Sequence, residues 1–191
     1  EASGQLPFPG CCNYTMTPWP CACIMSPMNQ LRILHSLAGI PPQQWDALAG
    51  GSICQPFLRH AFLSALEETG CVGTGTGWQP QHLTLWRDKT LVAAMPLYIK
   101  QHSFGEYVFD WAWAEACERH GLAYYPKLLS AIPFTPVQGQ RLLAVDEASR
   151  NALLDVALSH AQASAISSLH VLFPTPEEAV SLASRGLLLR H

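Results

Sequence analysis

The most strand-like stretch of the chain runs from residue 82 to residue 100 and reads HLTLWRDKTLVAAMPLYIK. Two apolar runs within it, 82–87 and 91–100, are joined at the charged pair Asp88-Lys89. Apolar runs that flank a short polar turn are typical of a β-hairpin. We therefore predict two antiparallel strands over these ranges.

The sequence before the hairpin predicts one strand and two helices. The strand is expected over residues 31–37, and a short helix opens at Pro41-Pro42 and ends at Gly50-Gly51. A longer helix is expected over 57–69, with Gly70 at its C′ position. Its inward face is predicted to hold Phe57, Leu58, Ala61, Phe62, Ala65 and Leu66.

The sequence after the hairpin predicts a further series of strands and helices. In chain order we expect an extended segment over 106–110, a short helix ending at Gly121, a proline-rich irregular stretch over 124–137, a strand over 140–145, a helix over 146–163, a buried strand over 168–173, a helix over 175–186 and a last strand from residue 187. Asp146 is expected to cap the first of the two long helices, and Thr175 and Glu178 to form a capping box on the other.

This order of elements indicates an α/β (α+β) fold. Antiparallel strands followed by alternating helices and strands are typical of one mixed, mostly antiparallel sheet with helices on both faces. The order is similar to that of an acyl-CoA N-acyltransferase (GNAT) unit. We therefore expect a GNAT-like unit over residues 28–191.

The composition excludes several classes of protein. The chain of 191 residues has a net charge of −3, 13% charged residues and a mean hydropathy of +0.11, which is too apolar for an intrinsically disordered chain. It has no basic cluster typical of nucleic-acid binding and no apolar run of about 18 residues that would span a bilayer. The low charge content indicates an apolar face that packs against a partner or a further segment.

Residues 1–27 differ in composition from the rest of the chain. They hold one charged residue, five of the 15 prolines and four of the seven cysteines. We predict a disordered or non-native leader that ends before Met28; the alternative is a cysteine-rich secreted head, although the cysteine spacing matches no common zinc site. Cys54, Cys71 and Cys117 are expected to be buried in a reducing compartment, so we predict a cytoplasmic protein without a metal site.

Aromatic residues concentrate in the second half of the sequence. Eight of the 18 lie between Phe104 and Phe134, where they alternate with polar and charged residues such as Glu106, Asp110 and Lys127. A groove with aromatic walls and a few polar groups is typical of a small-molecule site. The alternative is a second hydrophobic core beneath an irregular connection, in which the polar groups bond to one another.

Several strings of the chain resemble the bacterial FemAB-like family of predicted N-acyltransferases and peptidoglycan biosynthesis/recognition proteins. They are PFLRHAFLSALEE (56–68), GWQP (77–80), PLYIK (96–100), HSFGEYVFDWAWA (102–114), YYPK (124–127) and PFTPVQG (133–139). The resemblance runs from about Met28 to the last residue and implies an N-acyltransferase. Family members are about twice as long and resemble two GNAT-like units in tandem. The resemblance therefore implies that this chain forms the first unit and that its partner is a C-terminal half.

Acyl transfer from a thioester or ester to an amine requires a neutral amine, a polarised carbonyl and a proton for the leaving group. Glu106 or Asp110 is the candidate general base, and Tyr124 or Tyr125 is the candidate proton donor. The candidate substrate-binding residues are His102, Ser103, Tyr107, Trp111, Trp113, Tyr125, Lys127 and Phe134. For each residue, local packing or hydrogen bonding is the alternative role.

The sequence lacks the Gln/Arg-x-x-Gly-x-Gly/Ala turn with which GNAT enzymes hold the CoA pyrophosphate. The glycine-rich loop over 73–77 lies between a helix and a strand, which is the reverse of a dinucleotide fingerprint. We expect no tightly bound cofactor, with acyl-CoA or an aminoacyl-tRNA as donor substrate and a small-molecule amine as acceptor. Two alternatives remain: a non-catalytic module that recognises a peptidoglycan precursor or a peptide, and a fragment that is stable only with its other half.

Overall fold

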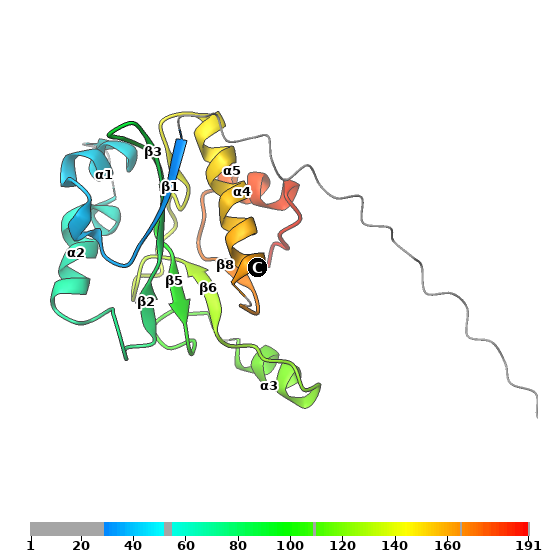
Figure 1. Cartoon of the computed structure of the whole chain (residues 1–191). Helices are drawn as coiled ribbons and strands as arrows, with labels where there is room; N and C mark the ends of the chain where they lie inside the picture. The colour runs from blue at the N-terminus through cyan, green and yellow to red at the C-terminus, as the bar shows by residue number, and fades with distance from the viewer. Residues whose placement is uncertain (1–28, 52–54, 109, 165, 191) are drawn as a thin grey trace, which may run out of the picture.

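The computed structural model describes residues 29–51, 55–108, 110–164 and 166–190, so the predicted leader and Cys54 lie outside the described residues. The chain forms a mixed α+β fold with two four-stranded sheets, where the sequence predicts one sheet (Figure 1). The first sheet contains, in spatial order, β1 (Asn29–Leu34), β3 (His82–Arg87), β4 (Thr90–Met95) and β7 (Leu143–Ala144), all antiparallel. The second contains β2 (Trp78–Pro80), β5 (Tyr98–Lys100), β6 (Lys127–Ser130) and β8 (Leu169–Val171), of which only the β6–β8 pair is parallel.

The predicted hairpin at Asp88-Lys89 is confirmed. Arg87 of β3 pairs with Thr90 of β4, which leaves a two-residue turn between the strands. Asp88 has a φ of 56°, the left-handed conformation that tight hairpin turns require and that aspartate tolerates better than most residues.

The predicted strand over 91–100 is two strands in different sheets. β4 ends before Pro96 and β5 begins after it, because proline has no N–H to donate to a strand ladder. The stretch 124–137, predicted to be irregular, contains β6, which is a central strand of the second sheet. Leu128 and Leu129 are fully buried there, so packing outweighs the nearby prolines.

Three other predicted strands are shorter in the structure. The strand expected over 31–37 ends before Ser36, whose side chain accepts a hydrogen bond from Ala38 N and caps the 3-10 turn η1 (Leu37–Gly39). β7 covers two residues of the predicted 140–145, and β8 covers three of the predicted 168–173 and is half-buried. Both are edge strands, which pair on one side only.

Two predicted extended segments form no strand. Residues 106–108 form a bend and irregular backbone, and Tyr107 has a φ of 60°, which is incompatible with a strand. Residues 187–189 pair with no described strand, and Leu188 is 86% exposed.

The helices follow the predicted order. They are α1 (Pro42–Leu48), the 3-10 turn η3 (Pro56–Leu58), α2 (His60–Glu68), α3 (Trp111–Arg119), α4 (Glu147–Ala163) and α5 (Pro176–Ser184). The predicted caps are confirmed: Asp146 Oδ1 accepts from Ser149 N at 2.7 Å, and Thr175 and Glu178 form the capping box. Glu178 also accepts from Arg141 N at 2.9 Å, which ties α5 to the chain just before β7.

The predicted inward face of the helix over 57–69 is wrong in part. The backbone is extended at Arg59, so η3 and α2 are separate and their side chains are out of phase. The exposed positions are Phe57, Ala61 and Ala65, and the buried positions of α2 are His60 and Leu63.

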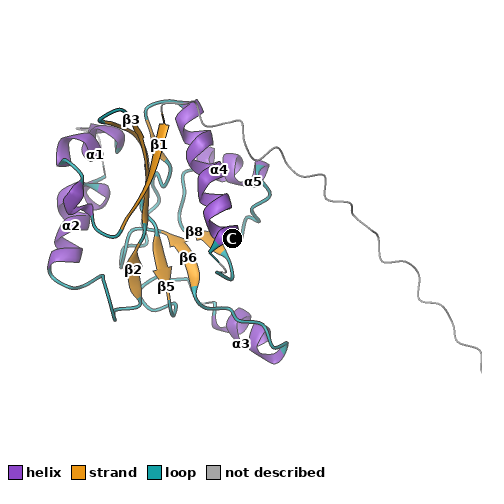
Figure 2. Ribbon diagram, viewed as in Figure 1, coloured by secondary structure: helices purple, strands orange, loops and turns teal. Residues whose placement is uncertain are grey.

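The two described cysteines are not buried, which corrects the prediction. Cys71 is exposed in the turn after α2, and Cys117 is half-buried on α3. Cys117 belongs to α3, a helix that projects beyond the second sheet and away from the other helices (Figure 2). Among the described residues, no helix has the length and apolar character needed to cross a bilayer.

Helices cover both faces of the first sheet, as predicted (Figure 1). α1 and α2 cover one face, where Trp45 and Leu63 pack with Trp86. α4 covers the other face, where Leu154 packs with Leu85 and other buried residues of β3 and β4. The described core therefore packs on both faces of the first sheet. The second sheet continues from the first sheet toward α3 (Figure 1).

Replacing Leu154, which is fully buried in α4, by alanine is expected to lower the free energy of unfolding by about 2–5 kcal/mol. The change removes apolar contacts and leaves a cavity between α4 and the first sheet. Urea denaturation measures the loss, with Val180→Ala as control because Val180 is 72% exposed on α5. Equal effects of the two changes would contradict the assignment of this layer to the core.

Candidate functional site

Two lysines lie directly opposite each other in the second sheet. Lys100 ends β5 and Lys127 begins β6, and the two are register partners in the antiparallel pair. Both are fully buried. Like charges directly opposite each other destabilise a sheet, so this pair requires compensating groups nearby. Those groups come from the loop over 101–110, which follows Lys100.

Lys127 donates hydrogen bonds to three acceptors. Its Nζ lies 2.5 Å from Asp110 Oδ2, 2.8 Å from Glu106 Oε2 and 3.2 Å from Ser103 Oγ. An ammonium group has three donors, so Lys127 is fully engaged within the protein. The ion pairs to Glu106 and Asp110 join the loop to the first residue of β6.

Lys100 contacts a different side of the same loop. Its Nζ donates to Phe104 O at 3.0 Å and lies 3.7 Å from the centre of the Trp78 ring, which is its neighbour on β2. Trp78 Nε1 donates to the same carbonyl at 3.1 Å. Burial lowers the pKa of Lys100 to about 7; Glu106 opposes this shift and the charge of Lys127 adds to it.

The two carboxylates have different proton affinities. Burial raises the pKa of Glu106, and the hydrogen bond from Lys127 only partly offsets this. Burial also acts to raise the pKa of Asp110, but hydrogen bonds from Lys127, Ser103 and Tyr124 outweigh it and lower the pKa to about 2. Glu106 Oε1 has no hydrogen-bond partner and lies 4.0 Å from Lys100 Nζ. Glu106 is therefore the better proton acceptor of the two.

Hydroxyl groups connect this charged cluster to the surface. Ser103 Oγ donates to Asp110 Oδ1 and lies 2.5 Å from the hydroxyl of Tyr125. The Tyr124 hydroxyl donates to Asp110 Oδ2 at 2.6 Å. Burial and the hydrogen bond to Asp110 raise the pKa of Tyr124, and burial raises the pKa of Tyr125, so both hydroxyls keep their protons.

A groove of about 570 Å³ lies over these hydroxyls. Its lining residues come from the loop after β5, from α3 and from the segment before β6, and are His102, Ser103, Phe104, Trp111, Ala114, Glu115, Glu118, Leu122, Ala123, Tyr124 and Tyr125. α3 forms one side of the groove and lies beyond the start of β6 (Figure 1). The His102 ring lies against Gly77, where any Cβ would clash with the ring, and burial and Lys100 lower the pKa of His102.

The structure brings most of the predicted site residues together. Ser103, Glu106, Asp110, Tyr124, Tyr125 and Lys127 form one hydrogen-bonded cluster, and His102 and Trp111 line the groove above it. Three others lie outside the lining. Tyr107 is 58% exposed, Trp113 stacks under Arg190 at 4.0 Å, and Phe134 packs against Trp78. The substrate-binding and catalytic roles of all the candidate residues stay predictions.

Lys100 and Glu118 are not predicted from the sequence, and Glu115 lies in the predicted aromatic stretch but not among the candidate site residues. One signal in the sequence could have revealed Lys100. It directly follows the apolar string Leu97-Tyr98-Ile99, and a lysine that is buried with such a string needs a partner. Glu115 and Glu118 are three residues apart on α3, a spacing that puts them on one face, but nothing in the sequence shows which side that face points to.

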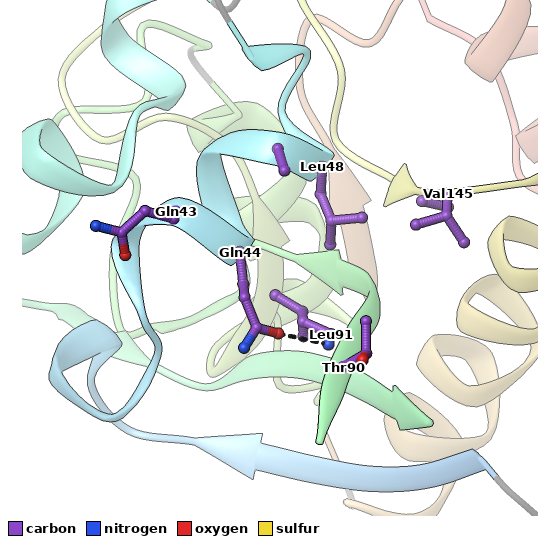
Figure 3. Close-up of a pocket in the computed structure, with 8 residues that line it drawn as sticks. Gln43, Gln44, Leu48, Thr90, Leu91 and Val145 are labelled. Carbon is purple, nitrogen blue, oxygen red and sulfur yellow. Dashed lines mark hydrogen bonds between the residues drawn. The ribbon is translucent and has the colours of Figure 1, made fainter. Parts of the chain in front are cut away.

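A second depression, of about 490 Å³, lies between α1 and the edge of the first sheet (Figure 3). Its lining residues are Gln43, Gln44, Ala47, Leu48, Thr90, Leu91, Ala144 and Val145, none of which titrates. Gln44 Oε1 already accepts from Leu91 N at 2.8 Å, as Figure 3 shows. Because this depression has no group able to move a proton, the groove beside α3 is the candidate site.

Comparison with known proteins agrees with the resemblance noted in the sequence. A family model described as FemAB-like, peptidoglycan biosynthesis/recognition, matches residues 36–191. The chain belongs to the FemAB-like family. The matched range includes the groove and the whole charged cluster of this FemAB-like protein. No curated protein and no solved structure matches the chain.

Replacing Lys127 by methionine is expected to lower the free energy of unfolding by about 3–5 kcal/mol, because it leaves two buried carboxylates without their cation. Urea denaturation measures the loss. Lys89→Met is the matched control, since Lys89 is exposed at the hairpin turn. A loss no larger than that of the control would show that Lys127 does not hold the cluster together.

Lys100 is expected to make stability depend on pH in the range from about 7 to 10. Its folded pKa of about 7 lies below its unfolded value, so the unfolded chain binds one more proton in this range and stability rises with pH. The free energy of unfolding of the wild type, minus that of Lys100→Met, should therefore increase from pH 7 to pH 9 by up to about 1.4 kcal/mol per pH unit. Urea denaturation at several pH values tests this, and a flat difference would be the contrary result.

Proposed function

We propose that the protein is an N-acyltransferase that transfers an acyl or aminoacyl group from an ester or thioester donor to an amine bound in the groove. The observation that carries this proposal is the chain of hydroxyls that runs from the groove to the buried carboxylates. Tyr125 and Ser103 lie in the groove lining, and Ser103 contacts both Asp110 and Lys127. Membership of a peptidoglycan biosynthesis/recognition family supports an amine of a peptidoglycan precursor as the acceptor.

The cluster supplies a route by which the acceptor loses a proton. An amine enters as an ammonium, which is not nucleophilic, and must be deprotonated first. Lys127 first donates one of its protons to Glu106 and becomes a neutral amine, whose nitrogen then accepts the proton of Ser103. Ser103 takes a proton from Tyr125 in turn, and Tyr125 takes one from the bound ammonium. Burial raises the pKa of Glu106, which makes it a better proton acceptor than Asp110.

The remaining steps balance without a further cofactor. The neutral nitrogen attacks the carbonyl carbon of the donor, a C–N bond forms, and the C–O or C–S bond breaks. Tyr124 donates its proton to the departing atom and regains one from the new amide nitrogen. Burial and Asp110 raise the pKa of Tyr124, so its proton suits a strongly basic alkoxide better than a thiolate, whose conjugate acid has a pKa near about 8.5. This favours an ester donor, such as an aminoacyl-tRNA, over acyl-CoA.

The GNAT-like assignment and the two-unit organisation belong to this proposal. The order of helices and strands and the covering of the first sheet on both faces support a GNAT-like unit. The absence of a pyrophosphate-binding turn from the sequence supports a donor site on another unit, for which a C-terminal half is the candidate partner.

One observation favours a second candidate function, recognition of a peptidoglycan precursor without turnover. Glu106 and Asp110 are 3% and 4% exposed and do not line the groove. Their ion pairs with Lys127 also serve a structural purpose, because they hold the loop that forms one side of the groove. A binding module needs this arrangement as much as an enzyme does.

Replacing Glu106 by glutamine separates the two functions, because glutamine keeps the shape of the side chain but cannot take up a proton. We expect turnover to fall by about 100-fold or more, while binding of the amine changes little. Mass spectrometry follows transfer from alanyl-tRNA or acetyl-CoA to a lysine peptide with an acetylated N-terminus. Glu68→Gln is the control, since Glu68 is exposed on α2.

Each outcome of this assay has a distinct meaning. If the wild type forms product and the Glu106→Gln protein forms it at the same rate, Glu106 is not the proton acceptor. In the full-length protein that includes the proposed C-terminal half, no product from either donor, together with measurable binding of the peptide, would overturn the transferase and leave the recognition module.

A further inference from the structure

Among the described residues, the lining of the groove has carboxylates on one side and no lysine or arginine. Glu115 and Glu118 both belong to the lining, are exposed and have no described ion pair. The nearest cations beneath it, Lys100 and Lys127, are fully buried and bonded to the loop and to the carboxylates of the cluster. The surface that a ligand meets is therefore negative.

The histidine in the lining does not cancel this charge. Burial and the neighbouring charge of Lys100 lower the pKa of His102, so its ring is neutral at pH 7. Arg190 is not part of the described lining; its guanidinium lies over the ring of Trp113, and its charge acts to lower the pKa of Tyr124 in the lining. The lining thus carries two formal negative charges, from Glu115 and Glu118, on the side formed by α3.

The other walls of the groove are aromatic and suit a cation as well. Trp111 is 58% exposed, and the rings of Tyr124 and Tyr125 lie 5.0 Å apart and nearly perpendicular. Ring faces attract ammonium and guanidinium groups, more strongly when water is excluded. α3 already shows this contact within the molecule, since the guanidinium of Arg190 lies 4.0 Å from the ring centre of Trp113.

We propose that the groove selects acceptors that carry a second positive charge, such as a diamine or a peptide with two basic groups. Glu115 and Glu118 bind one cationic group, and the other amine lies over the hydroxyls of Tyr125 and Ser103. The inference rests on the proposed function for the fate of that second amine, but the binding itself does not require turnover. The same charges repel phosphate groups, so the phosphates of an anionic donor lie outside this groove and only its reacting ester or thioester enters it.

The test is the binding of 1,5-diaminopentane, compared with that of 1-aminopentane and 1-pentanol, to the full chain by titration calorimetry. We expect the diamine to bind at least about 10-fold more tightly than the monoamine, and the difference to shrink as salt is added. The double variant Glu115→Gln/Glu118→Gln should bind the diamine at least about 10-fold more weakly. Glu68→Gln/Glu147→Gln is the matched control, because it removes two exposed carboxylates away from the groove.

Equal affinity for the diamine and the monoamine, or an unchanged affinity in the Glu115→Gln/Glu118→Gln protein, would overturn the inference. These results are independent of the transferase assay. Selective diamine binding without any product would sustain the inference and reject the transferase. Transfer to monoamines such as 1-aminopentane at the same rate as to diamines would reject the inference and sustain the transferase.

Discussion

The opposed pair of Lys100 and Lys127 is the constraint on which the site depends. Strand register puts these two ammonium side chains on the same face of the second sheet, where both are fully buried. A buried charge is tolerated only with a partner and hydrogen bonds, so carboxylates must come from a nearby segment. The loop after β5 supplies them, and its path follows from the need to bring Glu106 and Asp110 to Lys127.

This requirement also changes how α3 begins. Asp110 stands at the N-cap of α3, where aspartate usually accepts a hydrogen bond from the helix backbone. Here its side chain makes no capping bond, because its oxygens accept from Lys127, Ser103 and Tyr124. α3 is therefore joined to the second sheet by the charged cluster more than by apolar packing, which fits its lack of buried residues.

The same cluster links the fold to the proposed chemistry. Apolar residues of similar volume often stabilise a protein as well as a buried ion pair does, so stability alone does not account for two lysines and two carboxylates here. Glu106, with a raised pKa and an unpartnered oxygen, and Lys100, with a lowered pKa, are groups whose proton affinities approach the neutral range. Such groups beneath a groove lined with hydroxyls are suited to taking a proton from an amine.

The sequence by itself determined the features that depend on neighbouring residues. The turn at Asp88-Lys89, the caps at Asp146 and Thr175 and the clustering of candidate residues between 102 and 127 follow from local chemistry and short spacing. Only the tertiary structure decided that Pro96 divides one apolar run between two sheets, that a proline-rich segment supplies the central strand β6, and that Lys100 belongs to the site. The physical reason is that strand register and burial join residues far apart in the chain, and no local pattern records which partner a strand will meet.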